Sequence, residues 1–295
     1  MLIYRDSEFC PPSNYPIYPP YASGAYLEDY FTMRYRSEFL ESDFTRKLIQ
    51  VIWTPYYIDR SINKDSKIDQ NETLQVYLDS LPRDEKYFIV CQHDDAPLHR
   101  LPEDTVIFSA GGNHSSQNVV PIPLVVSKIP KDIVPDFENR DIFVSFIGSE
   151  THPIRGAVIR SIENKDRVVV NSRGWTNNVP QGDLERFVEV TKRSEFCLCP
   201  RGYGKTSFRM YEAMQLGAIP VYVSDSHYLP WTDELDWSEF CVLIDEADVA
   251  NTYEILKSIS EEKKQAMREK LIEVYDKYFT LNGVYDNIIK RVRSL

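Results

Sequence analysis

Short apolar runs alternate with amphipathic segments along most of the 295 residues. In the first half, apolar runs predict strands over 48–53, 87–92 and 106–110, and helical spacing predicts helices over 24–39 and 72–81. Strands of a parallel sheet are buried on both faces. In the sequence they are therefore continuous apolar runs, with helical segments between them. This half is therefore predicted to be an α/β domain.

The same alternation starts again after residue 140 and predicts a second α/β unit. Its predicted strands are 142–147, 167–170, 196–199, 218–223 and 241–244. Its predicted helices are 153–163, 183–194 and 206–216, and three further helices close the chain, the last over 284–292.

The run SKIPKDIVPDFENR separates the two alternations and is predicted to be an interdomain linker over 127–140. The expected architecture is two domains, 1–126 and 141–280, with a cleft between them and a helix at 281–295 that packs back on the first domain. Ligands of parallel α/β sheets bind beyond the carboxyl ends of the strands. The loops after Gln92, Ile147, Cys199 and Val223 are therefore the first places to look for a site.

Composition narrows the class of protein. The net charge is −11, from 34 Lys+Arg and 45 Asp+Glu, which argues against a nucleic-acid-binding protein. Five cysteines without framework spacing argue against a disulfide-stapled secreted domain. The N-terminal MLIYRDSEFC has no long apolar stretch, so we expect no signal peptide and no membrane insertion, and hence a soluble, cytoplasmic protein.

The densest group of polar residues lies between a predicted strand and a predicted helix, over 199–213. The start of a helix suits a phosphate, and Thr206 or Ser207 can cap this one. Arg209 falls in the first turn, where a cation opposes the helix dipole unless an anion is bound; the alternative is a surface salt bridge. One turn on, Glu212 is predicted either to accept hydrogen bonds from ribose hydroxyls or to pair with Arg209.

Gly204-Lys205-Thr206 also invites a comparison with the phosphate-binding P-loop. That motif requires a glycine five residues before Gly204, where this chain has Cys199. Gly202 is too close to replace it, which disfavours a P-loop nucleotidase. A second strand–glycine–helix element, Gly148 followed by Arg155, is predicted to reach the same ligand, whereas the nearby His152 is interpreted as a surface histidine.

Together, these residues resemble the exostosin-like glycosyltransferases. The resemblance is carried by FCLCPRG at 196–202, SFR at 207–209, GAIPV at 217–221, SD at 224–225, LP at 229–230 and LDW at 235–237. The run FVSFIG at 143–148 followed by Arg155, and YFIVCQHDDAP at 87–97, match the motifs that precede them in the family.

The resemblance implies a GT-B fold, in which two Rossmann-like domains face a central cleft. It also implies an acceptor-side N-terminal domain, a C-terminal domain that binds a nucleoside-diphosphate sugar, inversion at the anomeric carbon, and no obligatory metal or cofactor. Compact members of the family resemble proteins of large algal viruses, which suggests UDP-xylose as donor and a glycan hydroxyl, on fucose, as acceptor.

Inversion requires donors for the negative charge of the leaving diphosphate and a base for the acceptor proton. The predicted donor-binding set is Gly148, Arg155, Arg201, Lys205, Thr206, Ser207, Arg209, Glu212, Pro220 and Asp225, with Arg155 also counted as catalytic. Pro220, Pro230 and Trp231 are expected to shape the wall beside the nucleotide, and core packing is the alternative explanation for all three.

The predicted bases are Asp94 and His93. Asp94 and Asp95 superficially suggest a metal pair, but neighbouring side chains on an extended strand point apart. Asp94 has a structural alternative, as a cap of the loop before Pro97. Two other functions stay open: a P-loop-like nucleotidase and a non-catalytic glycan-binding module.

Overall fold

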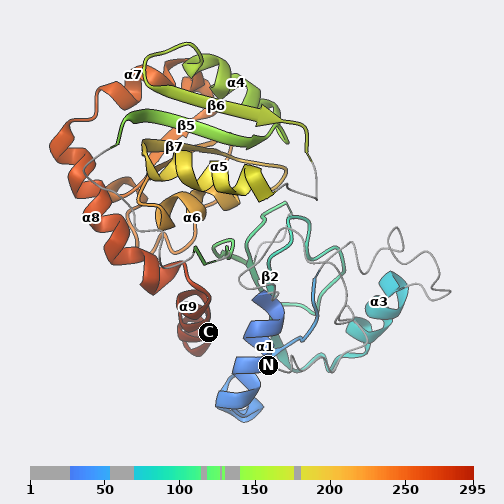
Figure 1. The fold of residues 1–295 in the computed structure, drawn as a ribbon. Helices are drawn as coiled ribbons and strands as arrows, with labels where there is room; N and C mark the ends of the chain where they lie inside the picture. The colour runs from blue at the N-terminus through green and yellow to red at the C-terminus, as the bar shows by residue number, and fades with distance from the viewer. Residues whose placement is uncertain (1–26, 54–69, 114–117, 127, 130–139, 176–180) are drawn as a thin grey trace. The chain divides into compact units, whose positions relative to one another are not determined.

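The computed structural model describes residues 27–53, 70–113, 118–126, 128–129, 140–175 and 181–295 (Figure 1). The chain divides into two compact units. Unit 1 is Met1–Val125 together with Leu281–Leu295, and unit 2 is Val126–Thr280. Most of the predicted linker lies outside the described residues, and the acceptor-side and donor roles of the two units stay predictions.

Unit 1 is built on a four-stranded parallel sheet in the order β1-β2-β3-β4. The strands are β1 (Arg46–Leu48), β2 (Lys86–Cys91), β3 (Val106–Ser109) and β4 (Val119–Pro121). The helices among the described residues before 126 are α1 (Leu27–Glu38), the short η2 (Glu41–Asp43) and α3 (Gln70–Ser80). Leu74 and Leu78 of α3 are buried against Ile89 of β2, so the helical spacing of apolar residues in α3 provides one side of the core.

Two strand predictions in unit 1 need correction. The strand expected over 48–53 ends at Leu48; the residues after it are buried but irregular, because an apolar run reports burial and not hydrogen bonding. The prediction also omitted β4, a half-buried edge strand of only three residues. The helix predicted over 24–39 is described from Leu27 onward.

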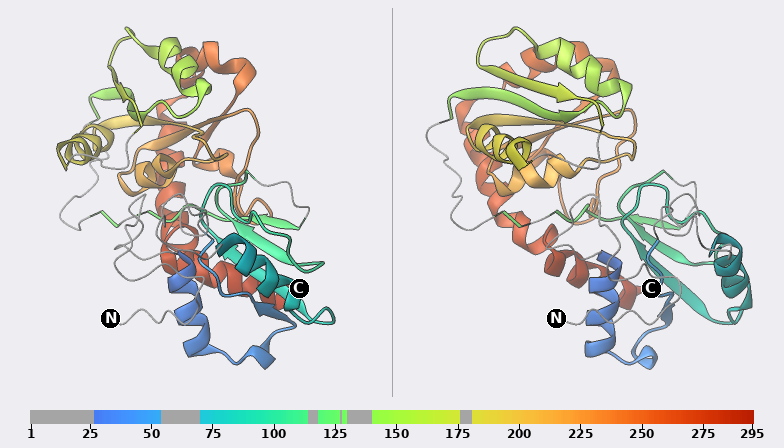
Figure 2. Two further views of the ribbon diagram at one scale, coloured as in Figure 1. Left: turned by 90° about the vertical axis from the view of Figure 1, so that its right-hand side faces the viewer. Right: turned by 45° about the vertical axis from the view of Figure 1, so that its right-hand side comes forward.

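The C-terminal helix α9 (Leu281–Ser294) packs on α1 within unit 1, and Figure 2 shows the two side by side. The ring centres of Phe31 and Tyr285 lie 5.0 Å apart, and the Arg34 guanidinium lies 4.0 Å from the centre of the Tyr285 ring. The Tyr285 hydroxyl donates to Glu38 at 3.0 Å. An aromatic interface with a cation–π contact therefore joins the end of the chain to α1.

Unit 2 contains a five-stranded parallel sheet in the order β6-β5-β7-β8-β9. Its strands are β5 (Ile142–Ser149), β6 (Val168–Arg173), β7 (Ser194–Pro200), β8 (Ile219–Ser224) and β9 (Val242–Asp245). Its helices are α4 (Pro153–Ile162), α5 (Gln181–Lys192), α6 (Phe208–Gln215), η3 (Trp237–Glu239), η4 (Glu246–Asn251), α7 (Thr252–Lys257) and α8 (Glu261–Tyr278).

Helices cover both faces of this sheet: α4 and α7 lie on one side, and α5 and α6 on the other (Figure 1). The core beneath α4 contains Val144, Phe146, Phe196 and Leu198, which alternate along β5 and β7 as the strand period requires. The α/β class with two units, each on a parallel sheet, is thus confirmed. The cleft expected between the two units stays a prediction.

A buried ion pair anchors α8 to the sheet of unit 2. Lys264 of α8 and Glu195 of β7 are both buried, and Lys264 Nζ lies 2.5 Å from a Glu195 carboxylate oxygen. The other Glu195 oxygen lies 2.7 Å from Arg167. Both oxygens of the buried carboxylate are therefore occupied, which is the condition under which a buried charge is tolerated.

Candidate functional site

The strand order of unit 2 places a topological switch point between β5 and β7. From β5 the chain moves to β6 on one side and then crosses to β7 on the other, so the loops that follow β5 and β7 leave the sheet in opposite directions. In parallel sheets with this order, ligands bind at the carboxyl ends of these two strands. Here those ends are Gly148–Ser149 and Pro200, followed by Arg201.

Arg155, on the first turn of α4, ties the segments around this point together. Its Nε donates to the Arg201 carbonyl at 2.9 Å, its Nη1 to the Ser149 carbonyl at 2.7 Å and its Nη2 to Ser207 Oγ at 3.5 Å. The side chain is buried. Its hydrogen bonds join the end of β5, the loop after β7 and the start of α6, so the geometry assigns it a positioning role. Sequence reasoning missed these contacts, because two of the acceptors are backbone carbonyls.

His152 supports Arg155 from the start of the same helix. It is the N-cap of α4, and its Nδ1 accepts from the Ile154 N–H at 3.3 Å, with Pro153 in the first turn. Burial and the charge of Arg201 lower its pKa, which keeps the ring neutral and able to accept. The ring is half-buried and stabilises the helix that carries Arg155, a structural role that the interpretation as a surface histidine did not include.

Arg201 and Asp225 pair with each other across the loops that follow β7 and β8. Arg201 Nη1 lies 2.6 Å from Asp225 Oδ1, and this hydrogen bond holds the Asp225 pKa below its usual range. Arg201 also donates to the carbonyls of Gly202 at 3.3 Å and Tyr203 at 3.1 Å. These two predicted donor-binding charges therefore fix the shape of the loop.

Gly202 shows how tightly this loop is packed. A Cβ at this position would lie 3.0 Å from Arg155 Nη2, so a larger residue would displace the guanidinium. The Gly202 N–H donates to the Thr206 carbonyl at 3.1 Å and closes the loop before α6.

Arg209 differs from the other two arginines. Its guanidinium lies 4.9 Å from the centre of the Phe146 ring and 5.8 Å from that of Phe187. Its Nε is buried without a hydrogen-bond acceptor, and within the described parts of the chain its guanidinium has no ion pair. The described residues therefore do not form the surface salt bridge that was the alternative explanation for Arg209.

Gly148 and Glu212 complete the surroundings of Arg209. A Cβ on Gly148 would lie 2.0 Å from Arg209 Nη2, so the absence of a side chain there admits the guanidinium. Burial raises the pKa of Glu212, and the positive charge of Arg209 opposes that rise. We call Gly148, Arg155, Arg201, Ser207, Arg209 and Glu212 the switch-point cluster.

The start of α6 lies two residues later than predicted, at Phe208. Ser207 is the N-cap residue, but its side chain makes no capping hydrogen bond, because its Oγ receives Arg155 instead. Thr206 Oγ1 is buried without a partner. Neither hydroxyl caps the helix. Lys205 Nζ lies 5.9 Å from the centre of the Tyr228 ring.

Pro220 and Trp231 do not join the cluster. Pro220 is the second residue of β8, about 13 Å from the carboxyl end of that strand at 3.3 Å per residue. Trp231 is buried, and its indole Nε1 donates to the Tyr278 carbonyl at 3.3 Å. Pro230 is also buried and accepts from Trp237 Nε1 at 2.8 Å. The burial and contacts of these residues fit the core-packing alternative, and a role in the nucleotide wall stays a prediction.

His93 and Asp94 lie in a turn after β2, in unit 1. His93 Nδ1 accepts from the Asp95 N–H at 3.2 Å, and burial lowers the His93 pKa to about 4, so the ring is neutral near pH 7. A Cβ on Gly111 would lie 2.1 Å from Asp94 Cα, so the loop after β3 packs directly on the Asp94 backbone. The turn is thus firmly held, and the role of base stays a prediction.

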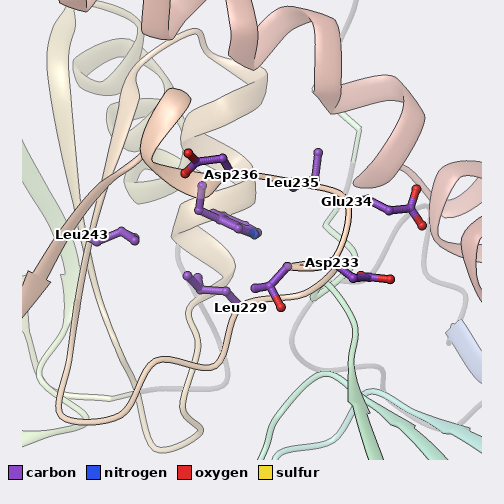
Figure 3. Close-up of a pocket in the computed structure, with 8 residues that line it drawn as sticks. Leu229, Asp233, Glu234, Leu235, Asp236 and Leu243 are labelled. Atoms are coloured by element: carbon purple, nitrogen blue, oxygen red, sulfur yellow. The ribbon is translucent and has the colours of Figure 1, made fainter.

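A separate pocket of about 500 Å³ lies in unit 2, along the loop between β8 and η3 (Figure 3). Its lining includes Asp233, Glu234 and Asp236, together with Leu229 and Leu243, and it includes none of the predicted donor-site residues. Figure 3 shows the three carboxylates spread along the loop without converging on one point. Across the described ranges, no group of three or more His, Cys, Asp or Glu is arranged to hold a metal ion.

No helix in the described part of the chain is long and apolar enough to cross a membrane.

Unit 2 is therefore an α/β unit whose polar and charged side chains gather at its topological switch point. Residues 85–259, more than half of the chain, match the Exostosin GT47 domain. The chain belongs to the exostosin GT47 family, as its motifs predicted.

Relatives of known name agree with this family. A probable glycosyltransferase of Arabidopsis thaliana is 30% identical over 149 residues, which cover 50% of this chain and 27% of the relative. A probable glucuronosyltransferase of Oryza sativa subsp. japonica is 34% identical over 154 residues, which cover 48% of this chain and 35% of the relative. The matches thus span about a third or less of these relatives.

Among solved structures, the chain is similar to the pneumococcal O-GlcNAc transferase GtfA in complex with UDP and GlcNAc. The TM-score is 0.40 at 11% identity, over 78% of this chain and 61% of that one.

Proposed function

We propose that this chain transfers a sugar from a nucleoside-diphosphate sugar to a glycan hydroxyl, and that Arg209 binds the donor diphosphate. One observation carries the proposal: a half-buried guanidinium lies at the switch point, and no described residue accepts a hydrogen bond from its Nε. A cation there is costly unless an anion compensates it. Membership of the exostosin GT47 family supports the same reading.

Two further features support an anionic ligand at Arg209. Arg209 is the second residue of α6, so the positive end of the helix dipole and the guanidinium both favour negative charge there. The two rings beside the guanidinium, Phe146 and Phe187, exclude water from part of it and strengthen its electrostatic interactions. A planar guanidinium can also hold two phosphate oxygens at once.

The proposed reaction is one displacement with inversion. The acceptor oxygen forms a bond to the anomeric carbon while the bond from that carbon to the phosphate oxygen breaks. The electron pair leaves with the diphosphate, where Arg209, Lys205 and the first N–H groups of α6 stabilise it; one such donor contributes on the order of 3 kcal/mol. Arg155 holds these groups in place through its bonds to Arg201 and Ser207.

The acceptor proton goes to a base, for which Asp94 is proposed. His93 is the weaker candidate, because a ring with a pKa of about 4 binds a proton poorly near pH 7. We propose that the reaction needs no metal, since the guanidinium and the helix start supply positive charge where the leaving group develops its negative charge.

The proposed donor is a UDP-sugar, with UDP-xylose tested first and fucose-containing glycans as acceptors, on the resemblance of the motifs to compact family members. UDP-glucuronic acid is the matched alternative, because a relative from rice carries the name probable glucuronosyltransferase.

The deciding experiment measures binding by thermal shift and calorimetry with UDP, UDP-xylose, UDP-glucuronic acid, a GDP-sugar and ATP, each with magnesium and with a chelator. We expect a UDP-sugar to protect without magnesium. Arg209→Ala should weaken its binding by about 10- to 100-fold, the effect of losing one or two hydrogen bonds to a charged group. Arg186→Ala removes an exposed arginine of α5 in the same unit and should change nothing.

Three results would count against the proposal. Protection by ATP with magnesium alone would favour a nucleotidase. Equal donor binding by the wild type and Arg209→Ala would remove Arg209 from the site. Binding of glycans with no donor hydrolysis or transfer over long incubation would favour a glycan-binding module.

A further inference from the structure

Glu28, in the first turn of α1, is a buried carboxyl that the proposed reaction does not use. It is 4% exposed. Its Oε1 accepts a hydrogen bond from the Gln92 N–H at 3.0 Å, and within the described parts of the chain its Oε2 is buried without a partner. One oxygen of this carboxyl thus holds the backbone at the end of β2, and the other accepts no hydrogen bond from a described residue.

Gln92 is held on its other side as well. Its side-chain Nε2 donates to the Val125 carbonyl at 3.4 Å, and its Oε1 accepts from the Val125 N–H at 3.2 Å. The next residues, His93, Asp94 and Asp95, form the turn with the predicted base. Glu28 therefore fixes the backbone of the last residue before that turn. Any change in the Glu28–Gln92 hydrogen bond alters the backbone position at which the turn begins.

Among the described residues, the titratable neighbours of Glu28 come from its own helix and from β2. Asp29 is the adjacent buried acid of α1, and its charge disfavours a second negative charge. On β2, the Cys91 thiol has a pKa raised by burial and by Glu28.

From α9, the titratable groups at the interface with α1 contact that helix further along its length. Tyr285 donates to Glu38, and Asp286 pairs with Arg34. Along the described stretches, no cation pairs with Glu28. Burial is the main reason why the Glu28 pKa is raised to about 7, and the Gln92 N–H opposes that rise.

We propose that Glu28 is a positioning residue of the transfer reaction, which holds the His93–Asp95 turn in its active geometry through the backbone of Gln92. The ionised carboxylate makes the stronger, charge-assisted hydrogen bond, so its deprotonation tightens the turn. This inference rests on the proposed function, because its kinetic effect presupposes sugar transfer.

The kinetic test compares the wild type with Glu28→Ala, Glu28→Gln and Glu38→Gln across pH 5.5–8.5. Glu28→Ala removes the acceptor of the Gln92 N–H and should lower kcat on the order of tenfold, with the KM for the donor unchanged. Glu28→Gln keeps a carbonyl oxygen toward Gln92 and should restore most of kcat, but its pH profile should lose the acidic limb near pH 7. Glu38→Gln, at the far end of α1, should retain the wild-type profile.

A second arm needs no activity: the Gln92 amide and the His93 ring are followed by NMR during a pH titration. We expect an inflection near pH 7 in the wild type and in Glu38→Gln, and none in Glu28→Gln. Wild-type signals without this inflection, or a Glu28→Gln enzyme with the wild-type pH profile, would overturn the inference. If transfer is never detected but the inflection is present, the proposed function has failed while Glu28 still controls the turn.

Discussion

Replacement of Glu28 by Gln should change how the stability of unit 1 depends on pH. Glu28 has an ordinary pKa of 4.5 and a pKa of about 7 in the folded chain. At low pH, Glu28 is protonated in both the folded and the unfolded chain. As the pH rises, the unfolded chain loses this proton first, so the free energy of unfolding falls. The fall ends when Glu28 also ionises in the folded chain, near pH 7. One pKa unit corresponds to about 1.4 kcal/mol, so this group removes about 3 kcal/mol of stability between pH 4.5 and 8.

Gln at position 28 has the same shape and cannot ionise, so the variant should lack this loss. Its extra amide hydrogens cost a constant amount of free energy that does not vary with pH. The measurement is urea unfolding, followed by circular dichroism and tryptophan fluorescence at pH 4.5, 6, 7 and 8. The difference in the free energy of unfolding between variant and wild type should move by about 3 kcal/mol in favour of the variant as the pH rises.

Glu38→Gln is the matched control on the same helix. The Arg34 side chain lowers the Glu38 pKa, so this group titrates at the acid end of the range and its removal should not alter the trend above pH 5. A constant difference between wild type and Glu28→Gln from pH 4.5 to 8 would refute the reasoning, because it would mean that Glu28 ionises alike in the folded and unfolded chain.

The remaining predictions concern unit 2. Gly148→Ala places a Cβ 2.0 Å from Arg209 Nη2, so it should abolish the donor-induced thermal shift while the circular dichroism spectrum stays that of the wild type; an unchanged shift would remove Gly148 from the site. Glu195→Ala removes the buried carboxylate at the buried Lys264 and leaves it only the exposed Glu261, so it should destabilise the chain by about 3 kcal/mol in urea unfolding. Replacing both members by apolar residues (Glu195→Leu with Lys264→Met) should recover most of that loss, and no recovery would contradict the charge-burial explanation.

Much of the fold was predictable because periodicity is a local property. The strands β2, β3, β5, β7 and β8 are continuous apolar runs that can satisfy their backbone only inside a covered sheet. The two strand predictions that failed did so because the method relies on apolar runs. β4 has only three half-buried residues and carries too little apolar signal, and the buried segment after Leu48 has the apolar signal without the hydrogen bonds.

The candidate site was only partly predictable. Local reasoning located the loop between β7 and α6 and put Arg209 in the first turn of that helix. It assigned Arg155, Arg201 and Arg209 to the donor site, with Arg155 also counted as catalytic, because a sequence states charge and not hydrogen-bond partners. The structure separates them: Arg155 and Arg201 donate to backbone carbonyls, and Arg201 also pairs with Asp225, whereas the buried Arg209 Nε has no acceptor among the described residues.

The sequence by itself determined the α/β class, the loop between β7 and α6, and the family, because apolar period, glycine spacing and motif order are properties of neighbouring residues. Only the tertiary structure decided that Arg155 positions the loop, that Pro220 lies at the wrong end of its strand, and that Glu28 is buried against Gln92. An acid in the first turn of a helix ordinarily faces water and complements the dipole. Its burial, which raises its pKa to about 7, and its hydrogen bond to the Gln92 N–H, 64 residues further along the chain, both arise only in the folded structure.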